Sequence, residues 1–149
     1  MSGPDTGNVF TGLATYAGAN VVTHSTAGGS DDIINGGAGV DTLYGGGGSD
    51  TFIFEAASAF ADTDIIMDFS TTDGDILDIS DILSGVVGIT AANIKDYISF
   101  TSDGATGDTL VQVDADGTTS GVNFQTIARL DSIVGLDEVS LYNAGDIIV

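Results

Sequence analysis

Three aspartates recur nine residues apart in a glycine-rich stretch between residues 27 and 53, and they are Asp32, Asp41 and Asp50. A large apolar residue stands two positions after each of them, in order Ile34, Leu43 and Phe52. Carboxylate and backbone carbonyl oxygens are the ligands that calcium prefers, about six to eight of them at roughly 2.3–2.6 Å. The spacing therefore predicts repeated turns whose stacking gathers oxygen ligands for a divalent cation.

Written in nines, the stretch reads AGGSDDIIN-GGAGVDTLY-GGGGSDTFI, and the last two copies follow G-G-x-G-x-D-x-U-x, where U is a large apolar residue. This nonapeptide is the calcium-binding repeat of parallel β-helices. Its first six positions suit a tight turn, where glycine permits positive φ, and its last three suit a short strand with one inward side chain. A flexible glycine linker is the alternative, but a linker gives no reason for aspartates at a fixed spacing.

The segment resembles the RTX (repeats-in-toxin) proteins, which bacteria export through type I secretion systems. The resemblance implies that two nonapeptides make one coil and that each calcium ion lies between one repeat and the next but one. One implied site joins Asp32 to Asp50 with carbonyls near Gly28, Ser30, Gly45 and Gly47. A second implied site uses Asp41 with Gly37 and Gly39, and its partner stays open because residues 18–26 contain no aspartate.

The charge of the chain is extreme, because 22 acidic residues face only Lys95 and Arg129 and the net charge is −20 over 149 residues. A chain without a basic patch cannot neutralise phosphates, so nucleic acid is excluded as a partner, and anionic membrane surfaces are disfavoured. Self-repulsion of this size opposes compaction unless counter-ions bind. A merely soluble acidic surface is the alternative. There is no cysteine, so disulfides and thiolate metal sites are excluded.

The expected fold is mainly β: a short parallel β-roll capped by a β-rich C-terminal segment with one or two short helices. Residues 1–26 are expected to form an N-terminal cap or degenerate coil, residues 27–80 the roll with its closing strands, and residues 81–149 a β-rich region that carries a secretion signal. The helical signals lie within residues 80–98, where Thr90 is a candidate N-cap for residues 91–97. From Ile98 onward strands are expected.

Residues 64–80 resemble the stretch that closes the β-roll of RTX exoproteins, D-x-I-x-D-F followed by G-D-x-I-D-L/I-S. The resemblance implies that Asp64 closes the last calcium site. Asp68, Asp75 and Asp78 fit the same pattern, and they fit equally well as surface carboxylates that flank strands.

The last four residues are Asp146, Ile147, Ile148 and Val149. An acidic residue followed by three apolar ones resembles the terminal signal of type I exported proteins, and the layout from residue 27 resembles the C-terminal target domain of large bacterial surface adhesins. The implied partners are an ABC exporter, a membrane fusion protein and an outer-membrane channel. The expected product is a monomer, secreted or held on the surface of a Gram-negative bacterium and exported without an N-terminal signal peptide, since MSGPDTGNVF has neither a basic segment nor an apolar run.

Catalysis is not expected from this chain. It has no G-x-S-x-G, no H-E-x-x-H and no cysteine nucleophile, and its one histidine cannot build a three-histidine metal site. No apolar run of about 18 residues suits insertion into a membrane. Two alternatives stay open: the tail of a type I secreted hydrolase such as a protease or lipase, and a calcium-dependent module that binds a glycan or another surface. Asp114–Gly117 resembles the opening of an EF-hand loop but is expected to be a plain turn.

Overall fold

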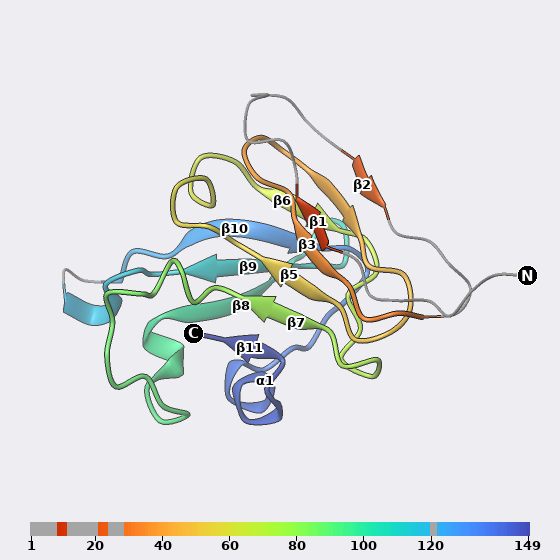
Figure 1. Cartoon of the computed structure of the whole chain (residues 1–149). Helices are drawn as coiled ribbons and strands as arrows, with labels where there is room; N and C mark the ends of the chain where they lie inside the picture. The colour runs from red at the N-terminus through yellow and green to blue at the C-terminus, as the bar shows by residue number, and fades with distance from the viewer. Residues whose placement is uncertain (1–8, 12–20, 24–28, 120–121) are drawn as a thin grey trace, which may run out of the picture.

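The computed structural model describes residues 9–11, 21–23, 29–119 and 122–149 (Figure 1). Short strands of three residues come first: β1 (Val9–Thr11), β2 (Val21–Thr23), β3 (Ile33–Asn35), β4 (Thr42–Tyr44), β5 (Thr51–Ile53), β6 (Asp64–Ile66) and β7 (Ile76–Asp78). The later elements are η1 (Ile94–Asp96), β8 (Ile98–Asp103), β9 (Asp108–Val113), η2 (Gly117–Thr119), β10 (Gln125–Leu130), α1 (Glu138–Ala144) and β11 (Ile147–Ile148).

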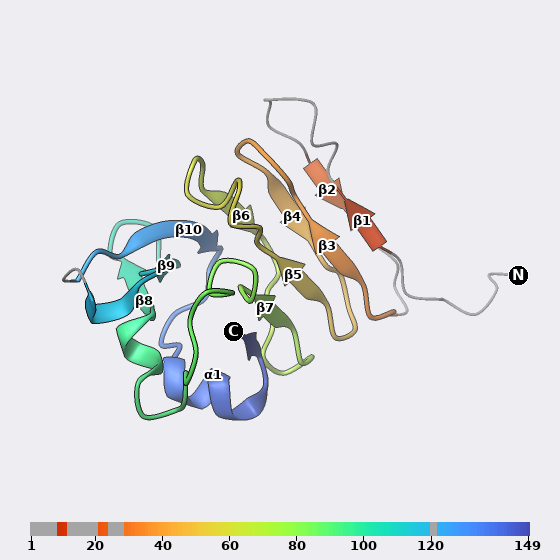
Figure 2. The ribbon, with the colours of Figure 1, turned by 60° about the vertical axis from the view of Figure 1, so that its left-hand side comes forward.

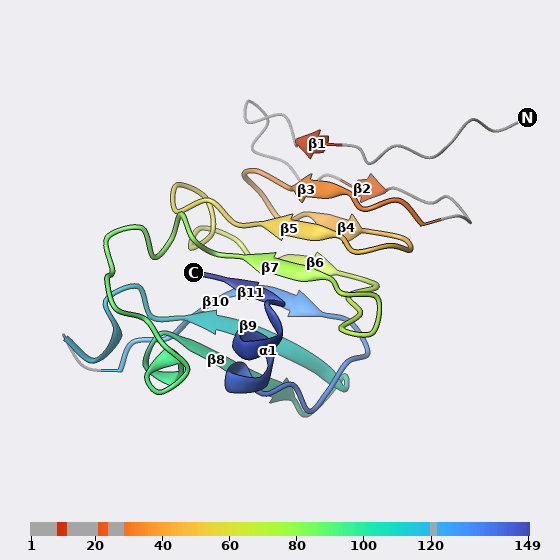
Figure 3. The same cartoon turned by 60° about the horizontal axis from the view of Figure 1, so that its bottom comes forward.

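The strands form two sheets, one in the order β1-β3-β5-β7-β11 and the other in the order β2-β4-β6-β10-β9-β8. The short strands alternate between the sheets, so each coil of the chain adds one parallel strand to each (Figure 3). A six-residue turn and a three-residue strand explain this path, because a turn at every ninth residue reverses the chain from one sheet to the other. The expectation of a mainly β fold built on a short parallel β-roll is confirmed.

The middle residue of each repeat strand points between the sheets because side chains alternate along a strand. In one sheet Ile34, Phe52, Leu77 and Ile147 lie in register, and in the other Leu43, Ile66 and Leu130 do. Each of these side chains is at most 4% exposed. The apolar residue of the nonapeptide is therefore the ladder that holds the two sheets together.

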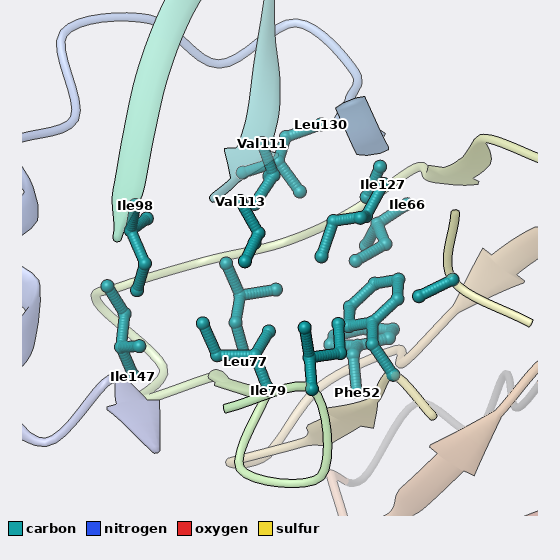
Figure 4. Close-up of a cluster of buried hydrophobic side chains, with 14 of the residues drawn as sticks. Phe52, Ile66, Leu77, Ile79, Ile98, Val111, Val113, Ile127, Leu130 and Ile147 are labelled. Atoms are coloured by element: carbon teal, nitrogen blue, oxygen red, sulfur yellow. The ribbon is translucent and has the colours of Figure 1, made fainter. Parts of the chain in front are cut away.

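The C-terminal part continues both sheets. β10 pairs in parallel with β6 and antiparallel with β9, which pairs antiparallel with β8, while β11 pairs in parallel with β7. Side chains from these strands extend the apolar core, as Figure 4 shows for Ile98, Val111, Val113, Ile127, Leu130 and Ile147 beside Phe52 and Leu77. The roll is thus closed by strands from the end of the chain.

The helices differ from the expectation. The helical segment near Thr90 is the short 3-10 turn η1. The side chain of Asn93 accepts hydrogen bonds from the Thr90 N–H and hydroxyl, so Thr90 is not the N-cap. The one α-helix that the structure describes, α1, was not anticipated at its position. It begins after Asp137, whose carboxylate accepts from Ser140 N, ends at Gly145 with φ 91°, and lies next to β11 (Figure 2).

Among the described residues, no helix has the length and apolar character needed to cross a bilayer.

Candidate metal centre

The repeat aspartates join successive coils through their carboxylates. Asp50 Oδ1 accepts a hydrogen bond from the backbone N–H of Asp32 at 2.9 Å, and Asp75 Oδ1 accepts one from Asp50 N–H at 2.9 Å. On the other side of the roll, Asp64 Oδ1 accepts from Asp41 N–H, again at 2.9 Å. Each carboxylate therefore turns into the stack, toward the turn of the coil before it, instead of pointing to solvent.

These carboxylates are buried, since none of the three repeat aspartates is more than 1% exposed. Only one carboxylate oxygen of Asp50 is hydrogen-bonded: Oδ1 accepts the Asp32 amide, but Oδ2 has no hydrogen-bond partner among the described residues. A buried carboxylate oxygen without a partner is costly, and it normally indicates an ion or water that completes it. The donor chemistry fits a hard cation such as calcium.

Glycine is required beside two of these carboxylates for reasons of space. A Cβ at Gly36 would lie 2.6 Å from Asp41 Oδ2, and a Cβ at Gly45 would overlap Asp50 Oδ2. The first glycine of the nonapeptide therefore leaves the room into which the aspartate five residues later folds. The repeat thus places an aspartate oxygen against the bare backbone that opens its own turn.

The turns that precede β3 and β5 lie directly against each other. A Cβ at Gly29 would lie 2.9 Å from the carbonyl oxygen of Gly47, and a Cβ at Gly48, where φ is 113°, would lie 2.6 Å from the carbonyl oxygen of Ser30. Both carbonyl oxygens therefore lie at the contact between the two turns. The structure thus places Ser30 and Gly47 at this contact, and Asp32 and Asp50, which end the two turns, are joined by a hydrogen bond.

The remaining predicted ligands are placed as follows. Gly28 lies outside the described residues. Gly37 and Gly39 belong to the turn that leads to Asp41, with φ 85° and 111°. The sequence leaves the partner of Asp41 open, and the structure places Asp64 beside it, with its carboxylate accepting the Asp41 amide.

The electrostatics of the turns favour a cation. Burial raises the pKa of Asp64 to about 7 and that of Asp75 to about 6, although the amides of Asp41 and Asp50 act in the opposite direction. Burial also raises the pKa of Asp50, and the charges of Asp32, Asp68 and Asp31 add to the effect. Low dielectric and like charges both disfavour the ionised form, and a bound divalent cation reverses both effects.

The chain supplies no positive side chain that could replace a cation in the roll, because neither Lys nor Arg precedes residue 95 in the sequence. Lys95 lies 3.1 Å from Asp137 and 3.6 Å from Glu138, and Arg129 lies 3.4 Å from Asp108. Both basic residues are thus engaged in the C-terminal part. Neutralisation of the roll's aspartates has to come from outside the chain.

No three histidine, cysteine, aspartate or glutamate side chains come together as a metal-binding group in the part of the chain that the structure describes. A cation held between the turns would take its ligands from backbone carbonyls, with one or two aspartates added. This composition suits calcium, which accepts both kinds of oxygen.

Sequence reasoning understated the role of Asp75. The sequence fits Asp75 equally well to the closing pattern and to a surface carboxylate, whereas the structure buries it to 3% exposure and its carboxylate accepts from Asp50 N–H, one coil away. The signal was present, since Gly74-Asp75-Ile76-Leu77 repeats the aspartate followed two positions later by an apolar residue. The nine-residue spacing is lost here, because residues 67–75 form a longer turn than the six-residue turn of the repeat.

The predicted secretion signal lies in and around the closing strand β11. The carbonyl oxygens of Asp146 and Ile148 accept hydrogen bonds from Leu77 N–H and Ile79 N–H, both at 2.9 Å. Ile147 is 4% exposed, Ile148 is 41% exposed and Val149 is partly buried against the core. The four residues are thus part of the folded domain.

Asp114–Gly117 is a turn, as expected. The carboxylate of Asp114 is occupied by backbone amides, since it accepts from Asp116 N–H at 3.3 Å and from Asn123 N–H at 2.8 Å.

The fold and the stacked aspartate turns define a parallel β-roll, and comparisons with known proteins agree. Two solved structures share the fold: the solution structures of the AlgE6R3 and AlgE6R2 subunits from the Azotobacter vinelandii mannuronan C5-epimerase. The first is 23% identical with a TM-score of 0.51 and covers 99% of this chain and 80% of its own. The second is 24% identical with a TM-score of 0.52 and covers 95% of this chain and 85% of its own.

Residues 26–56 match the family model of the RTX calcium-binding nonapeptide repeat (4 copies). The recognition of RTX repeats in this segment is therefore confirmed, and the segment coincides with the turns that carry Asp32, Asp41 and Asp50. No curated protein matches the chain.

Proposed function

We propose that this chain is a non-catalytic module of an exported protein and that it folds when it meets extracellular calcium. One observation carries the proposal: the repeat aspartates are buried between stacked turns, and Asp50 Oδ2 has no hydrogen-bond partner among the described residues. A site of this kind is unfavourable as it stands and becomes favourable when a cation is bound. The absence of Lys and Arg before residue 95 supports an external ion.

The residues that would hold calcium are Asp32 and Asp50 with the carbonyls of Ser30 and Gly47 in one pair of turns, and Asp41 and Asp64 in the other. Gly28, Gly37, Gly39 and Gly45 complete the proposed set. Bound calcium supplies positive charge at buried oxygens. At the low calcium level inside a cell, aspartate repulsion and the backbone entropy of the glycines favour the unfolded chain. At an extracellular level, the free energy of binding becomes free energy of folding.

The export part of the proposal rests on Asp146–Val149. We propose that these residues are read by a type I exporter while the chain is unfolded, and that the parent protein is a large adhesin secreted to, or held at, the cell surface of a Gram-negative bacterium. The net charge of −20 supports passage and folding in this order, because it disfavours collapse before calcium is met.

An enzyme parent is the second candidate. The two solved structures described above are subunits from an epimerase, which supports a parent whose catalytic domain lies elsewhere. In that case the module would still fold on calcium and would accompany a catalytic domain, as in a secreted hydrolase. It could also serve as a calcium-dependent module that binds a glycan.

The test is a calcium titration of the chelator-treated chain, followed by far-UV circular dichroism, with magnesium as the control ion. We expect a cooperative gain of β structure at roughly 0.1–1 mM calcium and none with magnesium. Changing Asp32, Asp41 and Asp50 together to Asn should abolish the transition. The matched control changes the exposed Asp62, Asp73 and Asp96 to Asn, which removes the same charge. A chain that is equally β-rich in chelator would overturn the proposal.

A further inference from the structure

Asp68 holds the start of the turn that carries Asp50. Its Oδ1 accepts a hydrogen bond from Gly45 N–H and its Oδ2 accepts one from Gly46 N–H, both at 2.9 Å. One carboxylate thus spans two consecutive amides of a turn one coil away. Charge-assisted pairs of this kind are short, strong and specific in direction.

The two amides belong to the part of the turn that shapes the candidate site. Gly45 is the residue whose missing side chain leaves room for Asp50 Oδ2, and Gly46 has φ 97°. Gly47, whose carbonyl oxygen lies against Gly29 of the neighbouring turn, follows directly. A shift of Gly45 and Gly46 would therefore move both Asp50 and the Gly47 carbonyl.

Asp68 is itself firmly placed. The next residue, Phe69, is 6% exposed, and its ring centroid lies 6.3 Å from that of Phe52 in the core. The anchored aromatic ring fixes the backbone of Asp68 under the turn. The core therefore restrains Asp68 through its backbone, while the hydrogen bond to Gly45 is partly buried and the one to Gly46 is exposed.

The charge of Asp68 works against the metal-free fold. After burial and the charge of Asp32, the charge of Asp68 also raises the pKa of Asp50. If Asp68 acted only through its charge, its neutralisation would ease the metal-free fold. If it acts through its two hydrogen bonds, neutralisation disorders the turn. The two effects have opposite signs and can be separated by experiment.

We propose that Asp68 is a positioning residue: it holds the turn of residues 45–50 in the shape that binds calcium, and it does so through Gly45 and Gly46 without being a ligand. The inference rests on the proposed calcium-coupled folding. Asp68 lies outside the nonapeptides, and it would nevertheless determine the shape of one of their turns.

The first test compares Asp68→Asn with Asp73→Asn, which removes the same charge from an exposed position on the same turn. The asparagine keeps one acceptor oxygen but directs an N–H donor at an N–H donor, so one bond is lost and one repulsive contact is made. We expect the calcium midpoint of the circular dichroism titration to rise about tenfold for Asp68→Asn and to change less than about twofold for Asp73→Asn. Equal midpoints for the two variants would overturn the inference.

The second test distinguishes positioning from general stabilisation. Europium(III) replaces calcium, and its luminescence lifetime reports the number of water molecules on the bound ion. We expect at least one added water in Asp68→Asn, because a displaced turn withdraws an oxygen. Ile147→Ala, which weakens the core at β11 and leaves Asp68 and Phe69 unchanged, should keep the number of the unaltered chain. Identical hydration in all three proteins would contradict the inference.

Asp68→Glu keeps the charge and both oxygens, and it serves for the luminescence measurement if Asp68→Asn does not fold at any calcium concentration. The outcomes also separate the two proposals. If the unaltered chain does not fold on calcium, the proposed function fails and the inference fails with it. If it folds and Asp68→Asn behaves like Asp73→Asn, only the inference fails.

Discussion

In the metal-free chain, protonation of the buried aspartates at low pH should stabilise the fold in part, as calcium is proposed to do. Two buried aspartates of the roll have raised pKa values in the folded chain, about 7 for Asp64 and about 6 for Asp75, against 3.8 for an unperturbed aspartate. A carboxyl with a raised pKa binds its proton more tightly in the folded state than in the unfolded state. The stability from this proton is full below about pH 4 and is lost as the pH rises through 6 and 7.

The size of the effect is large enough to decide folding. A change from 3.8 to about 7 is about three pKa units for Asp64, and a change to about 6 is about two units for Asp75. At 1.36 kcal/mol per unit these shifts amount to about 4 and about 3 kcal/mol. Both side chains are at most 8% exposed, so little of this is screened by solvent. A small domain is stable by about 5–15 kcal/mol in total.

The assay is far-UV circular dichroism of the metal-free chain between pH 8 and about pH 5, which stays above the isoelectric point near 4.1 and so avoids precipitation. We expect β structure to increase as the pH falls. Asp64→Asn should show part of this increase already at pH 8, whereas Asp96→Asn, which removes the same charge from an exposed position, should not. A metal-free spectrum independent of pH, or equal gains in both variants, would refute the reasoning.

Two further predictions concern packing. Gly36→Ala places a Cβ 2.6 Å from Asp41 Oδ2 and should lower the free energy of unfolding in saturating calcium by about 1–3 kcal/mol, while Gly104→Ala, which meets nothing within 4 Å, should leave it nearly unchanged. Ile147→Ala should lower the free energy of unfolding, measured by thermal unfolding in saturating calcium, by about 2–5 kcal/mol because the residue is 4% exposed. The neighbouring Ile148→Ala, at 41% exposure, should cost under about 1 kcal/mol, and equal losses for the pair would show that β11 is not packed.

The repeat was readable from the sequence because one residue type decides each position. Asp50 and Phe52 recur in a nine-residue frame, and the frame alone predicts a turn, a strand and an inward apolar ladder. These features are local in sequence, so they need no knowledge of tertiary contacts. The pairing of Asp32 with Asp50, in contrast, was implied only by the resemblance to RTX proteins, in which two nonapeptides make one coil.

The partners of Asp41 and Asp50 could not be read with the same confidence, because Asp64 and Asp75 follow turns longer than the repeat allows. Turn length is set by what the coil must pass around, and Phe69, packed beside Phe52, is a contact that no local pattern reports. The double hold of Asp68 on Gly45 and Gly46 likewise depends on a contact across more than twenty residues.

The helix Glu138–Ala144 could have been predicted from its ends. Asp137 is an N-cap residue that accepts from Ser140 N–H, and Gly145 is a left-handed C-cap. Of its seven residues only Leu141 is buried, so the sequence has no apolar periodicity from which a helix could be predicted. The pairing of β10 with β6 had no local signal at all, since it joins segments about sixty residues apart.

The central claim is that calcium orders the stacked aspartate turns, and backbone hydrogen exchange at residues 29–80 tests it most directly. The amides of Asp32, Asp41 and Asp50 donate to carboxylates of the next coil, so they report the stack itself. The account predicts that at pH 7.5 these amides exchange as in an unfolded chain in chelator, become strongly protected in millimolar calcium, and stay unprotected in magnesium. Equal protection with and without calcium would contradict it.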